Sequence, residues 1–230
     1  MCQDPSCSEL GSFHYSLDEV GCVSEFIERG VDLTSVDLSG VDLLVCLGSD
    51  NSVYWPQIAA EIKAESQLIL RASTTGIPVL GICFGAQMIA HTFGGRVSRS
   101  PKPEFGWTVV DDVAHEELAG SWMQWHVDRI EVPDSISVIG RNNAGIQAIR
   151  YGRCLGVQFH PEATYDVVSR WVSSGGQAEL EANGVDPEEI LETTRRNEAD
   201  SNSRCRALFE WFLSDVAQTS LNSPAIQIHN

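Results

Sequence analysis

The first half of the chain alternates short apolar runs with longer stretches of helical spacing. Apolar residues recur every three or four positions over 16–29 and 56–75, and again from Gly85 to Phe93, which predicts three helices. Between them, residues 41–47 and 79–82 are nearly unbroken apolar runs, which is typical of strands buried on both faces. This alternation predicts a parallel sheet with right-handed crossovers.

After Gly95 the pattern changes to short apolar runs separated by turn residues, which predicts a strand-rich and partly antiparallel second half. Two further helices are expected, one over 166–173 and one that begins at the cap Asp186-Pro187 and runs to Leu213. The tail from Ser214 is expected to be loose. The strand candidates in this half are Val97, 107–110, 122–125, 136–139, 146–149 and 154–159.

These elements predict an α/β fold with a mostly parallel central sheet flanked by helices. The chain of 230 residues is long enough for one well-buried core. We therefore expect a single domain over residues 1–213 and a flexible C-terminal tail over residues 214–230.

The charge of the chain argues against two classes of partner. Acidic residues outnumber basic ones by 32 to 15, and the formal net charge is −17. Such a surface repels phosphate backbones and anionic lipids, so we expect no nucleic-acid or membrane partner. No apolar run reaches the length of a membrane span and no secretion signal is recognisable, which predicts a soluble, cytoplasmic protein.

The seven cysteines are scattered, without CxxC pairs or zinc-like spacing to histidine. This pattern favours free thiols in a reducing compartment, with Cys46 and Cys154 in the core. We expect no metal site and no cofactor.

Cys83 is the exception among these thiols. It stands between the apolar run 79–82 and the helix that follows Gly85, with a glycine two residues away on either side. Small neighbours permit a sharp strand-to-helix turn that pushes a nucleophile out above the sheet edge. A helix N-terminus also favours the reactive thiolate, so this position predicts a catalytic nucleophile. The alternative is a buried structural cysteine.

A thiol nucleophile needs a base and a group that orients the base. His160-Pro161-Glu162 follows an apolar run, and residues two apart on an extended segment point the same way. An acid beside the imidazole fixes its tautomer and stabilises the imidazolium. We therefore predict that His160 and Glu162 complete a triad with Cys83, the alternative being a surface histidine and a solvated glutamate.

The segments Gly81-Ile82-Cys83-Phe84-Gly85-Ala86-Gln87 and Gly156-Val157-Gln158-Phe159-His160-Pro161-Glu162 resemble those of the class I (triad) glutamine amidotransferase family. The likeness is greatest to stand-alone members similar to the amidotransferase domain of GMP synthetase. It extends to the loop after Leu47 and to residues 103–107 and 124–128. The resemblance implies the flavodoxin-like fold of that family.

The resemblance also implies a mechanism. Cys83 attacks the side-chain amide of glutamine, His160 shuttles the proton and Glu162 orients His160. The oxyanion is held by the backbone N–H of Phe84 and by one in the Gly48-Ser49 loop, and Gln87 helps to hold the substrate. Two preorganised donors of this kind are a large part of acyl-transfer catalysis.

The chain departs from the family pattern in three places. Ser49 and Asp50 stand where the family usually has glycine and proline, so a left-handed backbone at Ser49 would be strained. Val127 replaces the glycine that usually follows His126. We expect His126 itself to have a structural role rather than to bind the substrate. The family also opens with an apolar strand that Met1-Cys2-Gln3 is too short to form, so either the sheet lacks an edge or the chain begins late.

Three functions follow as hypotheses. The first is a glutaminase that delivers ammonia to a separate synthetase, since the chain has no nucleotide-binding motif of its own. The second is a hydrolase of γ-glutamyl amides that uses the same triad without a partner, suggested by the altered Gly48-Ser49-Asp50 loop. The third is a non-catalytic regulatory subunit that retains the fold.

Overall fold

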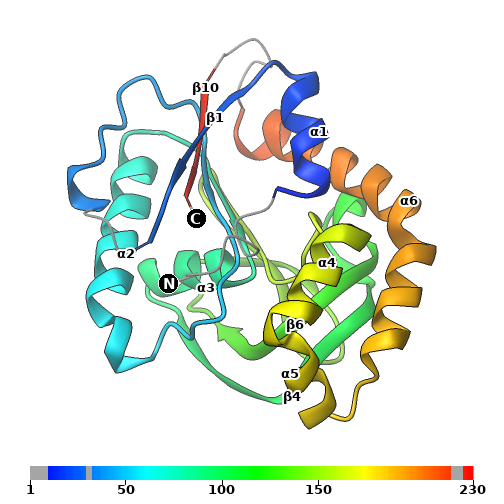
Figure 1. The fold of residues 1–230 in the computed structure, drawn as a ribbon. Helices are drawn as coiled ribbons and strands as arrows, with labels where there is room; N and C mark the ends of the chain where they lie inside the picture. The colour runs from blue at the N-terminus through cyan, green and yellow to red at the C-terminus, as the bar shows by residue number, and fades with distance from the viewer. Residues whose placement is uncertain (1–9, 30–32, 219–224, 230) are drawn as a thin grey trace.

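The computed structural model describes residues 10–29, 33–218 and 225–229. Its centre is an eight-stranded sheet with the order β1-β10-β2-β3-β9-β8-β7-β5 (Figure 1). The first five of these strands are parallel, and the other three continue the sheet in antiparallel pairs. The strands are β1 (Val23–Ile27), β2 (Leu44–Cys46), β3 (Val79–Ile82), β5 (Asp112–Val113), β7 (Ser137–Arg141), β8 (Ile146–Tyr151), β9 (Cys154–Val157) and β10 (Ala225–His229).

Outside this sheet, β4 (Arg96–Val110) and β6 (Gly120–Glu131) form a separate antiparallel ribbon. The expected α/β class, the mostly parallel sheet and the strand-rich second half are all confirmed.

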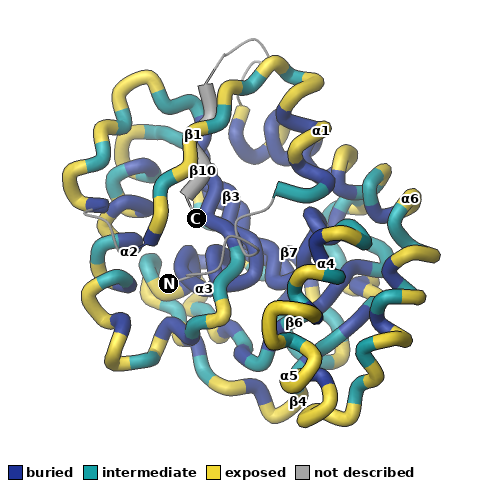
Figure 2. Tube along the Cα trace, viewed as in Figure 1, coloured by how far each residue is buried: buried dark blue, intermediate teal, exposed yellow. Residues whose placement is uncertain are grey.

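Helices cover both faces of the central sheet. One face packs against α2 and α3, and the other against α1 and α6, while α4 and α5 lie near the β4–β6 ribbon (Figure 1). Alternate residues on β2 and β3 belong to opposite cores. Every residue of the two strands is buried because both faces are covered, and Figure 2 shows this for β3. The helices are α1 (Ser12–Glu19), α2 (Ala59–Thr74), α3 (Phe84–Thr92), α4 (Tyr165–Trp171), α5 (Gln177–Ala182) and α6 (Pro187–Trp211).

Several helix predictions are confirmed. The predicted 56–75 helix is a 3₁₀ turn followed by α2, and the predicted 166–173 helix is α4. Asp186 caps α6 by accepting a hydrogen bond from the Glu188 N–H at 2.9 Å.

The helix expected over 16–29 is wrong. The chain ends α1 at Glu19, turns at Gly21 with φ 70°, and enters strand β1 at Val23. The apolar stripe that predicted one helix belongs to two elements, because Leu17 packs from α1 while Val23 and Phe26 lie on an edge strand. A glycine with left-handed backbone commonly ends a helix, and the spacing of apolar residues does not indicate such an end.

The C-terminal region also differs from the expectation of a loose tail from Ser214. A π-helical turn, Phe212–Val216, continues α6, and its apolar residues are buried. Residues 225–229 then form β10, which pairs in parallel with β1 on one side and with β2 on the other.

Candidate active site

Cys83 occupies a sharp turn between β3 and α3. Its backbone has φ 51° and ψ −105°, a conformation that L-residues rarely adopt, and it caps the N-terminus of α3. The flanking glycines allow this turn by close packing. A Cβ on Gly85 would lie 2.0 Å from the Cys46 carbonyl oxygen, and one on Gly81 would lie 2.5 Å from the backbone of Gly85.

Strand register brings the ends of three neighbouring strands together. Cys46 pairs with Gly81 across β2 and β3, and Ile82 pairs with Val157 across β3 and β9. The residues that follow these pairs leave the sheet at its carboxyl edge, where open α/β folds bind their ligands. This register places Gly48, Cys83 and the segment that begins at Gln158 side by side.

His160 and Glu162 are buried and in contact. The imidazole Nδ1 lies 2.6 Å from the Glu162 Oε1, and the two residues are 6% and 3% exposed. The backbone of His160 is fixed by its N–H, which donates to the Met123 carbonyl at 2.8 Å. Among the described residues none bonds the other ring nitrogen, Nε2.

The surroundings of His160 favour its protonated form. Burial disfavours the imidazolium, but the negative charges of the neighbouring Glu162 carboxylate and of the ionised Cys83 sulfur outweigh this cost. Together they raise the pKa of His160 well above its ordinary value. A base with these neighbours can accept a proton from the sulfur and hold it.

The Cys83 sulfur has two further polar neighbours. The Gln158 Nε2 donates to the Sγ at 3.6 Å, and the Trp125 carbonyl lies 3.8 Å from it. Gln87 donates its amide N–H to the Gln158 Oε1 at 3.3 Å, which orients the Gln158 amide toward the sulfur. Gln87 is a substrate-binding residue implied by the family resemblance, whereas Gln158 and Trp125 have no role predicted from the sequence.

The Gly48-Ser49 loop lies against the triad. A Cβ on Gly48 would stand 3.2 Å from the His160 Cε1 and 3.8 Å from the Cys83 Cβ, so the close approach depends on glycine. Ser49 is not among the residues with positive φ, and the strain considered for this position is absent. The Ser49 hydroxyl accepts hydrogen bonds from the Asn51 backbone and side chain at 3.2 and 3.0 Å. A serine therefore fits this loop and stabilises its turn.

These residues surround one cavity of about 400 Å³. Of the residues predicted from the sequence, only Phe84 does not line it. Phe84 begins α3 with a buried side chain, and as a first-turn residue its N–H has no partner within the helix. The lining residues are Gly48, Ser49, Asp50, Asn51, Ser52, Trp55, Cys83, Gln87, Arg99, Trp125, His126, Val127, Asp128, His160, Glu162, Trp171, Ser174, Gly175, Gly176 and Glu179.

Residues 17–169 match the family model for glutamine amidotransferase class-I. The chain belongs to this family. It is 31% identical to a glutamine-hydrolysing GMP synthase of Aeropyrum pernix over 202 residues, which cover 80% of this chain and 37% of that protein. It is 38% identical to the GMP synthase of Thermomicrobium roseum over 131 residues, which cover 53% of this chain and 23% of that protein. The chain spans well under half the length of these relatives.

A solved structure of a glutamine amidotransferase from Thermotoga maritima is similar over nearly the whole chain. The TM-score is 0.80 at 27% identity, and the match covers 91% of this chain and 94% of that one. A glutamine amidotransferase from Methylobacillus flagellatus has a TM-score of 0.76 at 21% identity, which supports the fold.

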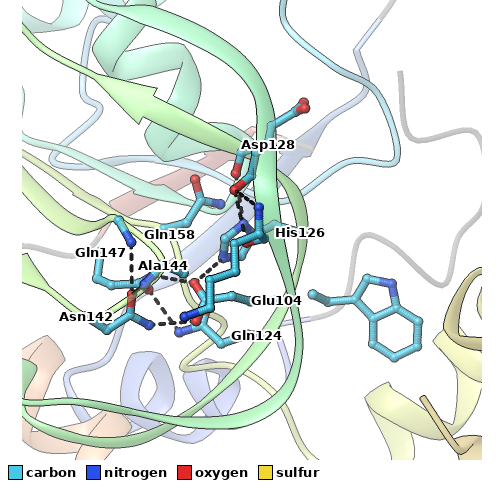
Figure 3. Close-up of polar contacts among 12 residues, drawn as sticks. Glu104, Gln124, His126, Asp128, Asn142, Ala144, Gln147 and Gln158 are labelled. Atoms are coloured by element: carbon cyan, nitrogen blue, oxygen red, sulfur yellow. Dashed lines mark hydrogen bonds and ion pairs between the residues drawn. The ribbon is translucent and has the colours of Figure 1, made fainter. Parts of the chain in front are cut away.

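Behind the cavity of this amidotransferase lies a buried polar network that supports strand β6 (Figure 3). The Glu104 carboxylate accepts from the Asn142 and Gln147 amides at 2.6 and 2.7 Å, and it lies 3.2 Å from the His126 Nε2. The other His126 nitrogen is 2.9 Å from the Asp128 carbonyl. Both ring nitrogens thus face the protein, in line with the structural role expected for His126.

Asp128 connects this network to the loop after β2. Its carboxylate accepts hydrogen bonds from the Ser52 hydroxyl at 2.5 Å and from the Tyr54 hydroxyl at 2.8 Å. Both donors lie in the segment that begins at Gly48. Asp128 therefore ties one end of the cavity wall to β6, a contact that no local pattern in the sequence indicates.

Three other described cysteines are fully buried in the core. Burial raises the pKa of the Cys46 and Cys205 thiols well above the ordinary value and that of Cys154 to about 11. The expected core positions of Cys46 and Cys154 are confirmed. Within residues 10–29, 33–218 and 225–229, no His, Cys, Asp or Glu side chains are grouped as metal ligands. Every helix in this part of the chain is too short or too polar to cross a bilayer.

Proposed function

We propose that this amidotransferase hydrolyses the side-chain amide of glutamine and delivers ammonia to a separate synthetase. The observation that carries the proposal is the convergence of Cys83, His160 and Glu162 on one cavity. Family membership and the similarity to glutamine-hydrolysing GMP synthases support it. The net charge of −17 supports a small-molecule substrate rather than nucleic acid.

In this mechanism the Cys83 sulfur attacks the amide carbon of glutamine and its proton passes to the His160 Nε2. The tetrahedral oxyanion is held by the N–H of Phe84 and by one N–H of the Gly48-Ser49 loop. His160 then protonates the leaving nitrogen, and ammonia departs as the carbon–nitrogen bond breaks. Glu162 stabilises the intermediate imidazolium through its contact with Nδ1.

The thioester that remains is hydrolysed by water. His160, neutral again, takes a proton from the water as its oxygen attacks the thioester carbon, and glutamate leaves as the carbon–sulfur bond breaks. The proton returns to the Cys83 sulfur, so one glutamine and one water give one glutamate and one ammonia.

The second candidate is hydrolysis of larger γ-glutamyl amides. The cavity favours it, because it extends beyond Cys83 to Trp55, Trp125 and Trp171 and has a volume of about 400 Å³. A leaving group larger than ammonia would contact these aromatic side chains.

The test is a glutamate-release assay that compares glutamine with γ-glutamyl amines of increasing size. We expect release from glutamine by the wild type and none by Cys83→Ala. A glutamine-like electrophile such as 6-diazo-5-oxonorleucine should label the wild type at Cys83 only. Preference for bulky γ-glutamyl amines would favour the second candidate, and absence of both labelling and release would leave only a non-catalytic subunit.

A further inference from the structure

Arg29 is a buried cation directly beside the Gly48-Ser49 loop. It is 4% exposed and forms an ion pair with Glu65 of α2, Nε to Oε2, at 2.8 Å. Nη2 donates to the Leu47 carbonyl at 2.6 Å and also to the Glu65 Oε1 at 3.4 Å, and Nη1 donates to the Gly48 carbonyl at 2.9 Å. Arg29 does not line the cavity, so it contacts the loop from behind.

These two hydrogen bonds determine how the loop peptides face. In a regular strand the carbonyls of successive residues point in opposite directions. The carbonyls of Leu47 and Gly48 both point toward the Arg29 guanidinium, so the chain is no longer a regular strand at these residues. In a trans peptide the N–H points opposite to the preceding carbonyl. Because Arg29 holds the Gly48 carbonyl, the Ser49 N–H points away from Arg29, and Ser49 lines the cavity.

Arg29 also contacts the residue that carries the other proposed oxyanion donor. Its guanidinium lies 4.7 Å from the centre of the Phe84 ring, a cation–π distance. The same side chain thus touches the loop that contains Ser49 and the first residue of α3. The planar fork of arginine can make these contacts at once, whereas the ammonium of lysine cannot.

Stability alone is a weak reason for such a pair, because burying two charges costs about as much as their attraction returns. We propose that Arg29, held by Glu65, is a positioning residue for the oxyanion hole, and that the Ser49 N–H is the loop donor. This inference rests on the proposed amide hydrolysis, since it assigns the geometry of that same site.

The decisive variant replaces both charges, Arg29→Met with Glu65→Met. It removes the two carbonyl contacts without leaving a lone buried charge, so its melting temperature should fall no further than the loss of these two hydrogen bonds requires, and less than that of Arg29→Met alone. We expect kcat for glutamine hydrolysis to fall about 10²-fold, as for loss of one oxyanion donor, with KM changed less than about threefold. Arg29→Lys keeps the charge beside Glu65 but loses the fork, and it should lose about tenfold in kcat.

Alkylation of Cys83 by iodoacetamide provides the readout that separates positioning from other roles. This displacement forms a carbon–sulfur bond and releases iodide without a tetrahedral oxyanion, so its rate should change less than about threefold in both variants. The matched control is Arg71→Met. Arg71 likewise donates to two main-chain carbonyls, those of Thr34 and Val36, but away from the cavity, and kcat should be unchanged.

The outcomes distinguish this inference from the function on which it rests. The first outcome is a wild type that releases glutamate, with kcat unchanged both in Arg29→Lys and in the double variant. Arg29 then does not position the site. Parallel losses of hydrolysis and alkylation would also overturn the inference, because Arg29 would then act on the nucleophile or the fold. If the wild type reacts with iodoacetamide but hydrolyses no amide, the proposed function itself fails.

Discussion

Gly48 is the glycine at which an added methyl group would approach both the base and the nucleophile of the active site. Its Cα faces both the base and the nucleophile, and an added methyl group would meet the His160 ring at 3.2 Å. That contact is tighter than a side chain normally accepts, so the imidazole or the loop must shift. Displacements well below 1 Å are enough to slow a reaction that depends on aligned groups.

We expect Gly48→Ala to lower kcat by about tenfold or more while changing the melting temperature little, because the loop lies at the edge of the core. Glutamate release and thermal unfolding provide the two measurements. Gly140→Ala is the matched control, since its Cβ would meet the Ala148 Cβ at 3.0 Å in the antiparallel half of the sheet. It should lose stability and keep its kcat, and the opposite pattern would contradict the explanation.

His160 is the residue whose charge should make stability depend on pH. Its pKa in the folded protein is raised well above the ordinary 6.5. A raised pKa stabilises the fold fully below the unfolded value, and this contribution disappears as pH rises through the folded pKa.

The difference in free energy of unfolding between wild type and His160→Gln should therefore shrink as pH rises above about 6.5, by at most about 1.4 kcal/mol per unit. Urea unfolding at a series of pH values measures it. The surface variant His14→Gln removes an exposed pair with Asp18 and should differ from wild type by less than about 0.5 kcal/mol throughout. A constant difference for His160→Gln would contradict the raised pKa.

At the scale of elements, the loop after β2 is held from two directions. Arg29 bonds its first carbonyls, and Asp128 of β6 accepts the hydroxyls of Ser52 and Tyr54. A loop without regular secondary structure is kept in one conformation by these contacts. The conformation of the cavity wall therefore depends on both attachments.

Asp128→Asn should weaken that attachment, because an amide has one acceptor oxygen for two hydroxyl donors. We expect kcat to fall about tenfold and the free energy of unfolding to fall by about 1–3 kcal/mol. Steady-state kinetics and urea unfolding measure these effects. Glu131→Gln on the same strand removes an exposed pair with Arg129 and should alter neither by a measurable amount. An Asp128→Asn enzyme with wild-type kcat would show that the loop needs no anchor.

The elements also show what the sequence can and cannot predict. The glycines around Cys83 and the spacing of His160 and Glu162 are local signals, and they predicted residues that the structure brings together. Arg29 with Glu65 and Ser52 with Asp128 are pairs distant in sequence, so only the packing of α2 and β6 reveals them. The error at 16–29 has a local cause as well, because Gly21 interrupts a stripe that otherwise continues with helical spacing.

For the whole molecule, the sheet order places the three strands that carry the site at its centre. β2, β3 and β9 are neighbours, and the antiparallel strands extend the sheet on the β9 side. On the β2 side the neighbour is β10, from the far end of the chain, which separates β2 from the edge strand β1 (Figure 1). The position of the Gly48-Ser49 loop thus depends on backbone pairing with the last described residues.

Removal of residues 219–230 should lower the melting temperature by about 5 °C or more, since each kcal/mol shifts it by about 2–4 °C in a chain of this size. The lost pairings join residues 225–229 to β1 and residues 227–229 to β2. Calorimetry measures the shift, and an insertion of two Gly-Ser units between Gln218 and residue 219 is a control that retains the strand. Equal melting temperatures for the truncated and full chains would restore the expectation of a loose tail.

The backbone conformation of Cys83, with φ 51° and ψ −105°, serves catalysis but lowers the thermal stability of the fold. Conformations of this kind cost about 1–3 kcal/mol for any residue with a side chain, and glycine alone avoids the cost. Cys83→Gly should accordingly unfold at a higher temperature than Cys83→Ala, although both lack the thiol. A residue with a side chain at this turn therefore carries a conformational cost, and the protein bears that cost in order to present a nucleophile there.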